Sequence, residues 1–183
     1  EGRVPASEWA RMRAPLQAGE FPFPVKYGYC AVGVIEAGPA ARIGETVFCL
    51  HPHQDRFLAP ATMCIPLPAG LPPARAVLGA NMETTLNILW DARPLLGERF
   101  FIPEKRTLDR RLTIQATQVG SLAPSMRGRR SHAERLELAL RLLAEDDWCD
   151  ALLAAPVGFA DLPAALPALL GPDGPPCPLV AYI

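Results

Sequence analysis

The stretch from Pro72 to Phe101, PPARAVLGANMETTLNILWDARPLLGERFF, decides how the rest of the chain is interpreted. Its apolar side chains recur at the spacing of a helix, at Val77, Leu78, Met82, Leu86 and Leu89. Proline lacks a backbone N–H and its ring clashes with the preceding turn, so Arg93-Pro94 marks a helix end. The stretch therefore predicts one helix that ends near Arg93.

The residues after this helix differ from the sequence expected of a nucleotide-binding unit. Gly97-Glu98-Arg99 followed by Phe100-Phe101-Ile102 is typical of a turn into a buried strand, and a βαβ unit with a glycine-rich nucleotide loop is the expected continuation. The chain continues instead with Pro103-Glu104-Lys105-Arg106, and no G-x-G-x-x-G turn occurs in the sequence. Such a turn lets backbone N–H groups approach a pyrophosphate. We therefore expect no Rossmann domain in this chain.

Length and charge limit the classes of function. A chain of 183 residues, 50% hydrophobic and 20% charged, is long enough for one ordinary globular core. The net charge of −1 provides no basic excess for nucleic acid or for an anionic membrane surface. No apolar run reaches the roughly 18 residues that a membrane-spanning helix needs. We therefore expect neither nucleic acid nor a membrane as a partner.

The cysteines predict a reducing compartment. Their number is odd and their spacing irregular, without a C-x-x-C pair, at Cys30, Cys49, Cys64, Cys149 and Cys177. A small secreted scaffold would show an even set at regular spacing. We therefore expect reduced thiols in a cytoplasmic protein.

The remaining pattern predicts a mainly β fold with flanking helices, of class α+β. The 21 prolines and 14 glycines suit short strands joined by many corners. Strands are expected at Val25 to Gly38 with breaks at Gly28 and Gly33, and at Thr46 to Leu50, Arg56 to Ala59, Cys64 to Leu67, Leu112 to Thr117 and Leu179 to Ile183. Their spacing favours a partly open β-barrel.

Two helices are expected near the C-terminus. Ser131-His132-Ala133-Glu134 has the pattern of a capping box, and the helix it starts carries an apolar face of Leu136, Ala139, Leu140 and Leu143. Asp161 is a candidate N-cap for a shorter helix that reaches Leu170 and ends at Gly171. Four arginines near the first helix, Arg127, Arg129, Arg130 and Arg135, are interpreted as a solvated charged loop in preference to a phosphate site.

Four segments taken in order resemble the medium-chain dehydrogenase/reductase superfamily. They are KYGYCAVGVIEAG, RIGETVFCL, LPPARAVLGANMETTLNILWDARPLLGERF and ELALRLLAEDDWCDALLAAPVGFADLPAALPALL. In that superfamily a GroES-like catalytic domain is built from both ends of the chain, with a Rossmann domain inserted between them. The resemblance implies that residues 1–100 and 112–183 form one GroES-like domain, and that 101–111 is the junction where the nucleotide domain is missing.

The resemblance also implies that zinc is absent. The G-H-E motif of the zinc-dependent members aligns with Gly28-Tyr29-Cys30, and a later cysteine ligand aligns with Ala80. A catalytic zinc needs three protein ligands, and two are replaced here by residues without a suitable donor. The chain is therefore similar to the zinc-independent branch, whose parent family uses NAD(P), although this chain alone lacks most of the cofactor surface.

The same resemblance implies roles for residues of the central helix. Thr84 matches a position beside the nicotinamide, and Gln118-Val119-Gly120 matches the place where the chain re-enters the catalytic domain past the cofactor. Glu83 and Asn87 are expected to face the substrate cleft. Helix capping and ordinary surface polarity explain the polar residues of this helix equally well.

Other candidate catalytic residues come from residue chemistry. On an extended segment Cys49, His51 and His53 would alternate onto one face, where a histidine could act as a general acid or, less favourably, bind a metal. Solvated histidines in a polar turn are the alternative. Tyr29 could donate a phenolic proton to a carbonyl, although a barrel tyrosine is more often part of the core.

Three functions follow from these observations. The first is the catalytic and substrate-binding domain of a zinc-independent NAD(P)-dependent oxidoreductase, inactive without its nucleotide domain, that acts on a small-molecule alcohol, carbonyl or enoyl substrate. The second is a GroES-like binding module without redox activity. The third is a metal-dependent enzyme that uses His51 and His53. The sequence leaves a homodimer open.

Overall fold

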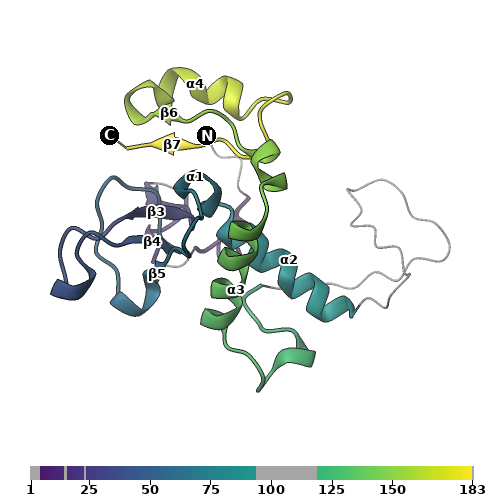
Figure 1. The fold of residues 1–183 in the computed structure, drawn as a ribbon. Coiled ribbons are helices and arrows are strands. Elements are labelled where there is room, and N and C mark those ends of the chain that lie inside the picture. The colour runs from purple at the N-terminus through teal and green to yellow at the C-terminus, as the bar shows by residue number, and fades with distance from the viewer. Residues whose placement is uncertain (1–4, 15, 23, 94–118, 183) are drawn as a thin grey trace.

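The fold is of the α+β class, as predicted, but helices predominate. The computed structural model describes residues 5–14, 16–22, 24–93 and 119–182. Within these ranges helical residues outnumber strand residues, and the strands form three separate small sheets (Figure 1). The prediction of a mainly β chain is therefore wrong. The described strands have two to four residues each and do not close into the expected partly open barrel, which needs a continuous wall of paired strands.

The elements are as follows. The strands are β1 (Ala18–Gly19), β2 (Val25–Lys26), β3 (Ala31–Val34), β4 (Thr46–Cys49), β5 (Ile65–Pro66), β6 (Val157–Gly158) and β7 (Val180–Ala181). The α-helices are α1 (Pro73–Ala76), α2 (Gly79–Ala92), α3 (His132–Glu145) and α4 (Leu162–Leu169). The 3-10 turns are η1 (Ala6–Glu8), η2 (Ala40–Arg42), η3 (Ala61–Met63), η4 (Pro124–Met126), η5 (Trp148–Leu152) and η6 (Phe159–Asp161).

The largest sheet has the order β3-β4-β5, with both pairs antiparallel. The predicted strand at Thr46 to Leu50 is confirmed, whereas the strand expected at Val25 to Gly38 is divided into β2 and β3 around Gly28. Gly28 has a φ of 119°, outside the range of extended L residues, so the strand cannot run through it. The segment Arg56 to Ala59 is not a strand.

Helix α2 confirms the prediction from its apolar spacing. It runs from Gly79 to Ala92 and ends at Arg93, which adopts the left-handed conformation and donates its N–H to the carbonyl of Leu89 at 3.0 Å. At the first residue a side chain on Gly79 would lie 3.0 Å from Leu140 and 3.1 Å from Phe48. Glycine therefore lets the start of α2 pack closely between the sheet and α3.

Helix α3 confirms the capping box. The Ser131 hydroxyl accepts from the N–H of Glu134 at 3.1 Å, and the Glu134 carboxylate accepts from the N–H of Ser131 at 2.7 Å. The predicted apolar face is buried, and three of its leucines share one core with Phe48 and Ile65 of the β3-β4-β5 sheet. Residues on the two sides of the undescribed segment 94–118 therefore pack into a single core.

One buried arginine joins α2 to α3. Arg135 is 1% exposed, and its guanidinium donates to Oε1 of Glu83 at 3.0 and 2.9 Å and to Oδ1 of Asn87 at 2.6 Å. The same group donates to the carbonyls of Val119, at 2.6 Å, and Ser121, at 3.4 Å. Arg135 is therefore part of the core, and its interpretation as a member of a solvated loop is wrong.

A second arginine holds the end of α3. Arg75 on α1 makes two bonds of 2.6 Å to the two carboxylate oxygens of Asp150. It also donates to the carbonyls of Leu143, at 3.2 Å, and Asp146, at 3.1 Å. The last carbonyls of a helix have no partner within the helix, so Arg75 satisfies groups that would otherwise need water.

The C-terminal elements form a layer of their own. Strands β6 and β7 pair in parallel, with Val157 opposite Val180, and α4 lies against them on the side away from the β3-β4-β5 sheet (Figure 1). Asp161 is the N-cap of α4 as predicted, although its side chain makes no capping bond, and the helix ends at Leu169. Among the described residues no helix has the length and apolar character needed to cross a membrane.

We expect Arg135→Met to lower the free energy of unfolding by about 3 to 5 kcal/mol, because it leaves the carboxylate of Glu83 buried without its partner. The double variant Glu83→Met/Arg135→Met should recover much of this loss, since no buried charge then remains. Urea unfolding followed by circular dichroism measures both. Arg141→Met, on the exposed face of α3, is the control and should change stability by less than about 0.5 kcal/mol. If Arg135→Met and Arg141→Met lowered the free energy of unfolding equally, a structural role for Arg135 would be contradicted.

The Arg75–Asp150 pair predicts an acid-dependent loss of stability. The hydrogen bonds and charge of Arg75 lower the pKa of Asp150 below its ordinary value of 3.8, against an opposing effect of burial. Because the folded pKa is the lower one, the stabilisation is present at neutral pH and is lost as the pH falls from 3.8 through the folded pKa. Asp150→Asn should therefore be less stable than the wild type at pH 7, with the difference shrinking in acid. Urea midpoints across this range measure it. Glu137→Gln, on the exposed face of α3, should track the wild type at every pH, and a pH-independent deficit in Asp150→Asn would contradict the linkage.

Candidate functional site

The candidate site is a hollow of about 320 Å³ at the start of α2. It is lined by Tyr29, Ala80, Asn81, Thr84 and Thr85. The four α2 residues lie one turn apart in two pairs and so form one face of the helix, while Tyr29 comes from the segment before β3. The volume is near the lower limit of small-molecule pockets, and it would hold a single ring with a small substrate.

Tyr29 supplies a hydrogen-bond donor to this hollow. Its side chain is 45% exposed, so the phenol is accessible from solvent. Burial of the ring raises the pKa of Tyr29 above 10.0, and the neighbouring Cys30 and Tyr27 add to the effect. The hydroxyl is therefore protonated at neutral pH and can donate to an oxygen atom bound in the hollow.

The two threonines offer acceptors. Thr84 Oγ1 donates to the carbonyl of Ala80 at 3.0 Å, and Thr85 Oγ1 donates to the carbonyl of Asn81 at 3.1 Å. Because each hydroxyl proton is used within the helix, the lone pairs of the hydroxyl oxygen remain for a ligand. The exposed amide of Asn81 adds a donor and an acceptor. A ligand with an amide N–H and a carbonyl would match this set.

Cys30, the residue next to Tyr29, is held by a backbone hydrogen bond. The backbone N–H of Ala80 is hydrogen-bonded to the thiol of Cys30, while burial and the nearby Cys177 raise the pKa of Cys30 to about 12. The thiol is therefore protonated at neutral pH. Within the described ranges no group of three His, Cys, Asp or Glu residues is placed to hold a metal ion.

The structure does not bring His51 into the hollow. Its ring is 5% exposed and stacks on Phe57, with centroids 3.7 Å apart and planes 11° apart. Nδ1 lies 2.9 Å from the carbonyl of Pro52, which identifies it as the protonated nitrogen. One ring face and Nδ1 of His51 are therefore engaged by contacts within the chain.

His53 lies apart from His51, near Tyr29 but outside the hollow. Its backbone N–H donates to the carbonyl of Tyr27 at 3.0 Å, and its ring fills the space that a side chain at Gly28 would need. Burial lowers the pKa of His53, so the ring is neutral at pH 7. The alternation of His51 and His53 onto one face is not observed, because the backbone between them is irregular.

Glu83 and Asn87 point toward α3 and do not line the hollow. They are 5% and 1% exposed and bind Arg135, so they connect α2 with α3 where a substrate contact was expected. The carbonyl of Val119 binds the same arginine, and no heavy atom lies within 4 Å of the position of a side chain on Gly120. Gln118 lies outside the described residues.

The sequence interpretation gave Asn81 and Thr85 no site role and placed Arg135 in a solvated loop. Asn81 lies one turn before Thr84, and Thr85 lies one turn after Asn81, so helical geometry connects both with Thr84. Arg135 could have been found from its phase, because it lies four residues before Ala139 and eight before Leu143 on the buried stripe of α3. Its partner Glu83 is likewise buried, on the face of α2 that meets α3.

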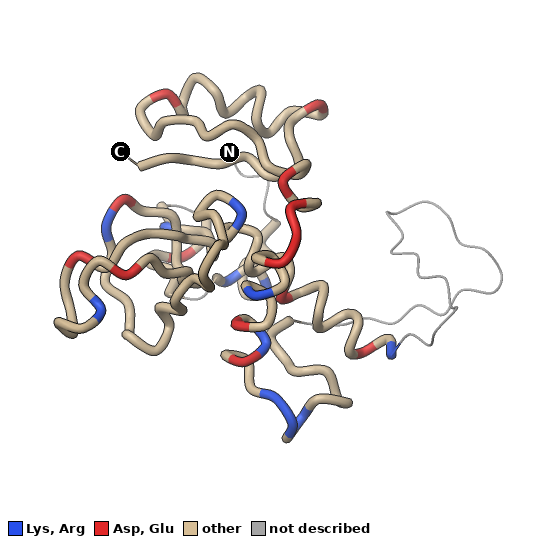
Figure 2. Tube along the Cα trace, in the orientation of Figure 1, with Lys and Arg blue, Asp and Glu red and all other residues tan. Residues whose placement is uncertain are grey.

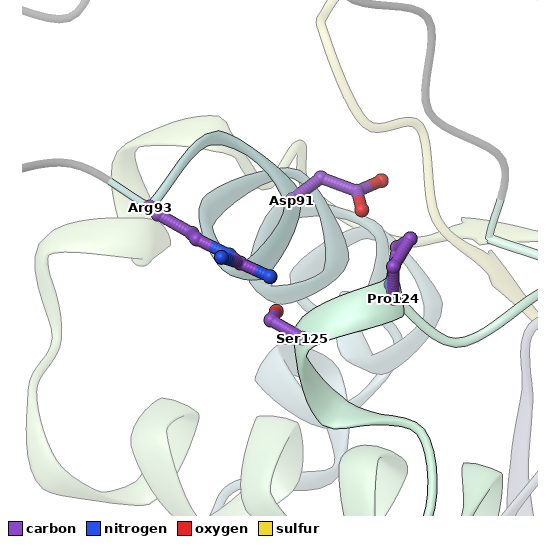
Figure 3. A pocket seen from close by; sticks show the side chains of 4 residues that line it. All are labelled: Asp91, Arg93, Pro124 and Ser125. Atoms are coloured by element: carbon purple, nitrogen blue, oxygen red, sulfur yellow. The ribbon is translucent and has the colours of Figure 1, made fainter.

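A second hollow of about 310 Å³ lies at the other end of α2. It is lined by Asp91, Arg93, Pro124 and Ser125 (Figure 3). Ser125 donates its hydroxyl to the carbonyl of Trp90 at 2.7 Å, and the Arg93 side chain extends toward Ser125. None of the site residues predicted from the sequence lines this second hollow. It includes Arg93, which is the last described residue before the segment 94–118.

Charges are mixed along the described chain (Figure 2). Three exposed arginines, Arg127, Arg129 and Arg130, gather in the turn between η4 and α3. They were predicted as part of a solvated loop, and the structure confirms their exposure. None of them borders the hollow around Tyr29.

Comparison of the chain with protein-family models, curated proteins and solved structures gives no match. The geometry of the described residues, together with the sequence, is therefore the basis for a functional proposal.

Proposed function

We propose that this chain is the catalytic and substrate-binding domain of a zinc-independent NAD(P)-dependent oxidoreductase. One observation carries the proposal: Tyr29 and Thr84 line the same hollow. The two residues were selected by unrelated arguments, Tyr29 as a proton donor to a carbonyl and Thr84 as a nicotinamide neighbour. A substrate and a nicotinamide must meet at van der Waals contact for hydride transfer, so both residues belong in one site.

The residues of the hollow fit the two partners of a hydride transfer. A bound nicotinamide cofactor supplies the hydride. Thr84 keeps an acceptor oxygen for an amide N–H, such as that of a nicotinamide carboxamide, and Asn81 lies beside it. Tyr29 holds a proton within reach of the hollow, and it can donate that proton to a carbonyl oxygen as negative charge develops there. Ala80 contributes only a methyl group between them.

The size of the hollow sets a limit on what this chain does alone. A volume of about 320 Å³ suits a nicotinamide ring with a small carbonyl compound, and the adenine half of the cofactor needs a further surface. The sequence lacks the glycine-rich turn that would hold the pyrophosphate. We therefore assign to this chain the orientation of the nicotinamide half and the proton transfer, and no tight binding of the whole dinucleotide by itself.

A binding module without redox activity is the second candidate. The lack of a glycine-rich turn favours it, since a binding module needs no dinucleotide. A hollow lined by Tyr29, Asn81 and two threonines can bind a small polar molecule without any cofactor. The two candidates differ in one property, which is hydride transfer in the hollow.

Reduced nicotinamide mononucleotide, the half of the cofactor that fits the hollow, tests the proposal. We expect saturable amide shifts at Asn81, Thr84 and Thr85 in a titration followed by nuclear magnetic resonance, with a Kd in the millimolar range. With a panel of reactive aldehydes, ketones and quinones, we expect slow oxidation of the mononucleotide. Tyr29→Phe should lower that rate by about 10²- to 10⁴-fold, since it removes the proton donor.

Tyr27→Phe is the matched control, because Tyr27 is a neighbouring tyrosine whose ring packs on Phe21 outside the hollow. It should leave the rate unchanged. Shifts at these amides without any Tyr29-dependent oxidation would favour the binding module. The absence of saturable shifts at the start of α2 would contradict the oxidoreductase proposal.

A further inference from the structure

Two cysteines face each other across the β4-β5 pair. Cys49 is the last residue of β4, and Cys64 directly precedes β5. The register pairs Val47 with Pro66 and Phe48 with Ile65. The next pair along the same antiparallel register is therefore Cys49 and Cys64.

The hydrogen-bond pattern defines which kind of pair this is. The N–H of Leu67 donates to the carbonyl of Thr46 at 3.1 Å, so these two residues form a hydrogen-bonded pair. Bonded and non-bonded pairs alternate along an antiparallel ladder, which makes Cys49 and Cys64 a non-bonded pair. Opposite Cα atoms in such pairs are about 4.5 Å apart, inside the roughly 4.4 to 6.8 Å range of disulfides.

The thiols and the backbone support this geometry. Both cysteines are free, and their thiols are close enough to hydrogen-bond with each other. Burial, with the neighbouring thiol of Cys64, raises the pKa of Cys49 to about 12. Arg42 donates to the carbonyl of Cys64 at 2.7 Å and to that of Ala61 at 2.9 Å, which fixes the backbone on the Cys64 side. The two sulfur atoms therefore need little backbone movement to meet.

We propose that Cys49 and Cys64 are a reversible redox-modification site that a low-molecular-weight disulfide converts to an intramolecular disulfide. Cys64 reacts first because it is partly exposed, whereas Cys49 is buried. Its thiolate attacks the small disulfide, forms a mixed disulfide and expels one thiolate, which takes up the proton that Cys64 lost. Cys49 then loses its proton and attacks the sulfur of Cys64, releasing the second small thiol. The two protein thiols are oxidised by two electrons, and one small disulfide is reduced to two thiols.

The bond would act on the loop that joins the two strands. This loop carries His51 and His53 and includes η3. A crosslink that closes a loop of about 15 residues restricts the unfolded chain, and for a protein of this size it should raise the Tm by roughly 6 to 12 °C. Reduction reverses the change, so the stability of this sheet would depend on the thiol–disulfide balance of its surroundings.

The test is oxidation of the native 183-residue chain by oxidised glutathione, followed by alkylation of the remaining thiols. We expect a mass lower by two hydrogens, before alkylation, with no retained glutathione. Trypsin cleaves after Arg56, between the two cysteines, so the crosslink should join peptides 43–56 and 57–75. The Tm should rise as stated and return after dithiothreitol.

Two variants make the result decisive. Cys64→Ser should match the reduced wild type in Tm and show neither the crosslink nor the rise; Cys64→Ala replaces it if the serine variant does not fold. Cys177→Ser is the matched control and should keep both, because Cys177 lies beside Leu153 near the C-terminal strands. A glutathione adduct on Cys64 with Cys49 still alkylated would overturn the proposal, and so would a crosslink that maps to Cys30 and Cys177.

Discussion

The buried guanidinium of Arg135 is the interaction on which the rest of the structure depends. It binds Glu83 and Asn87 of α2 and the carbonyls of Val119 and Ser121, and it is almost completely withdrawn from water. A buried charge is tolerated only when it is paired and fully hydrogen-bonded. The helix that carries Glu83 therefore has one allowed rotation against α3.

That rotation also creates the candidate site. Successive residues of an α-helix point about 100° apart, so the direction of Glu83 toward Arg135 turns Thr84 and Ala80 toward Tyr29. Gly79 lets the start of α2 approach Phe48 and Leu140, which brings this face next to the β3-β4-β5 sheet. A single helix thus anchors the core through one face and lines the hollow with the adjacent face.

Local signals in the sequence predicted the helices and the class α+β. The apolar spacing of α2 and the capping box at Ser131 depend on neighbouring residues only, and both are confirmed. The barrel was wrong because strand pairing is non-local: Gly28 interrupts the first strand and Arg56 to Ala59 stays irregular, although its composition suits a strand. Arg135 was misjudged from its charge, while its phase on α3 already placed it among buried leucines.

The candidate site was predictable only in part for the same reason. Glu83, Thr84 and Asn87 are all polar, and residue type alone does not say which of them faces a ligand. The partner across the helix pair decides it: Glu83 and Asn87 point to Arg135, and Thr84 points to the hollow. His51 was a candidate because of its residue type, but its ring stacks on Phe57.

Native-state hydrogen exchange of α2 and α3 tests most directly whether the Arg135 contacts join the two parts of the chain into one unit. If they do, the slowest amides of both helices open with the same free energy and respond equally to low concentrations of urea. Amides of α2 that exchange through a separate opening, at a free energy well below that of α3, would contradict this central claim.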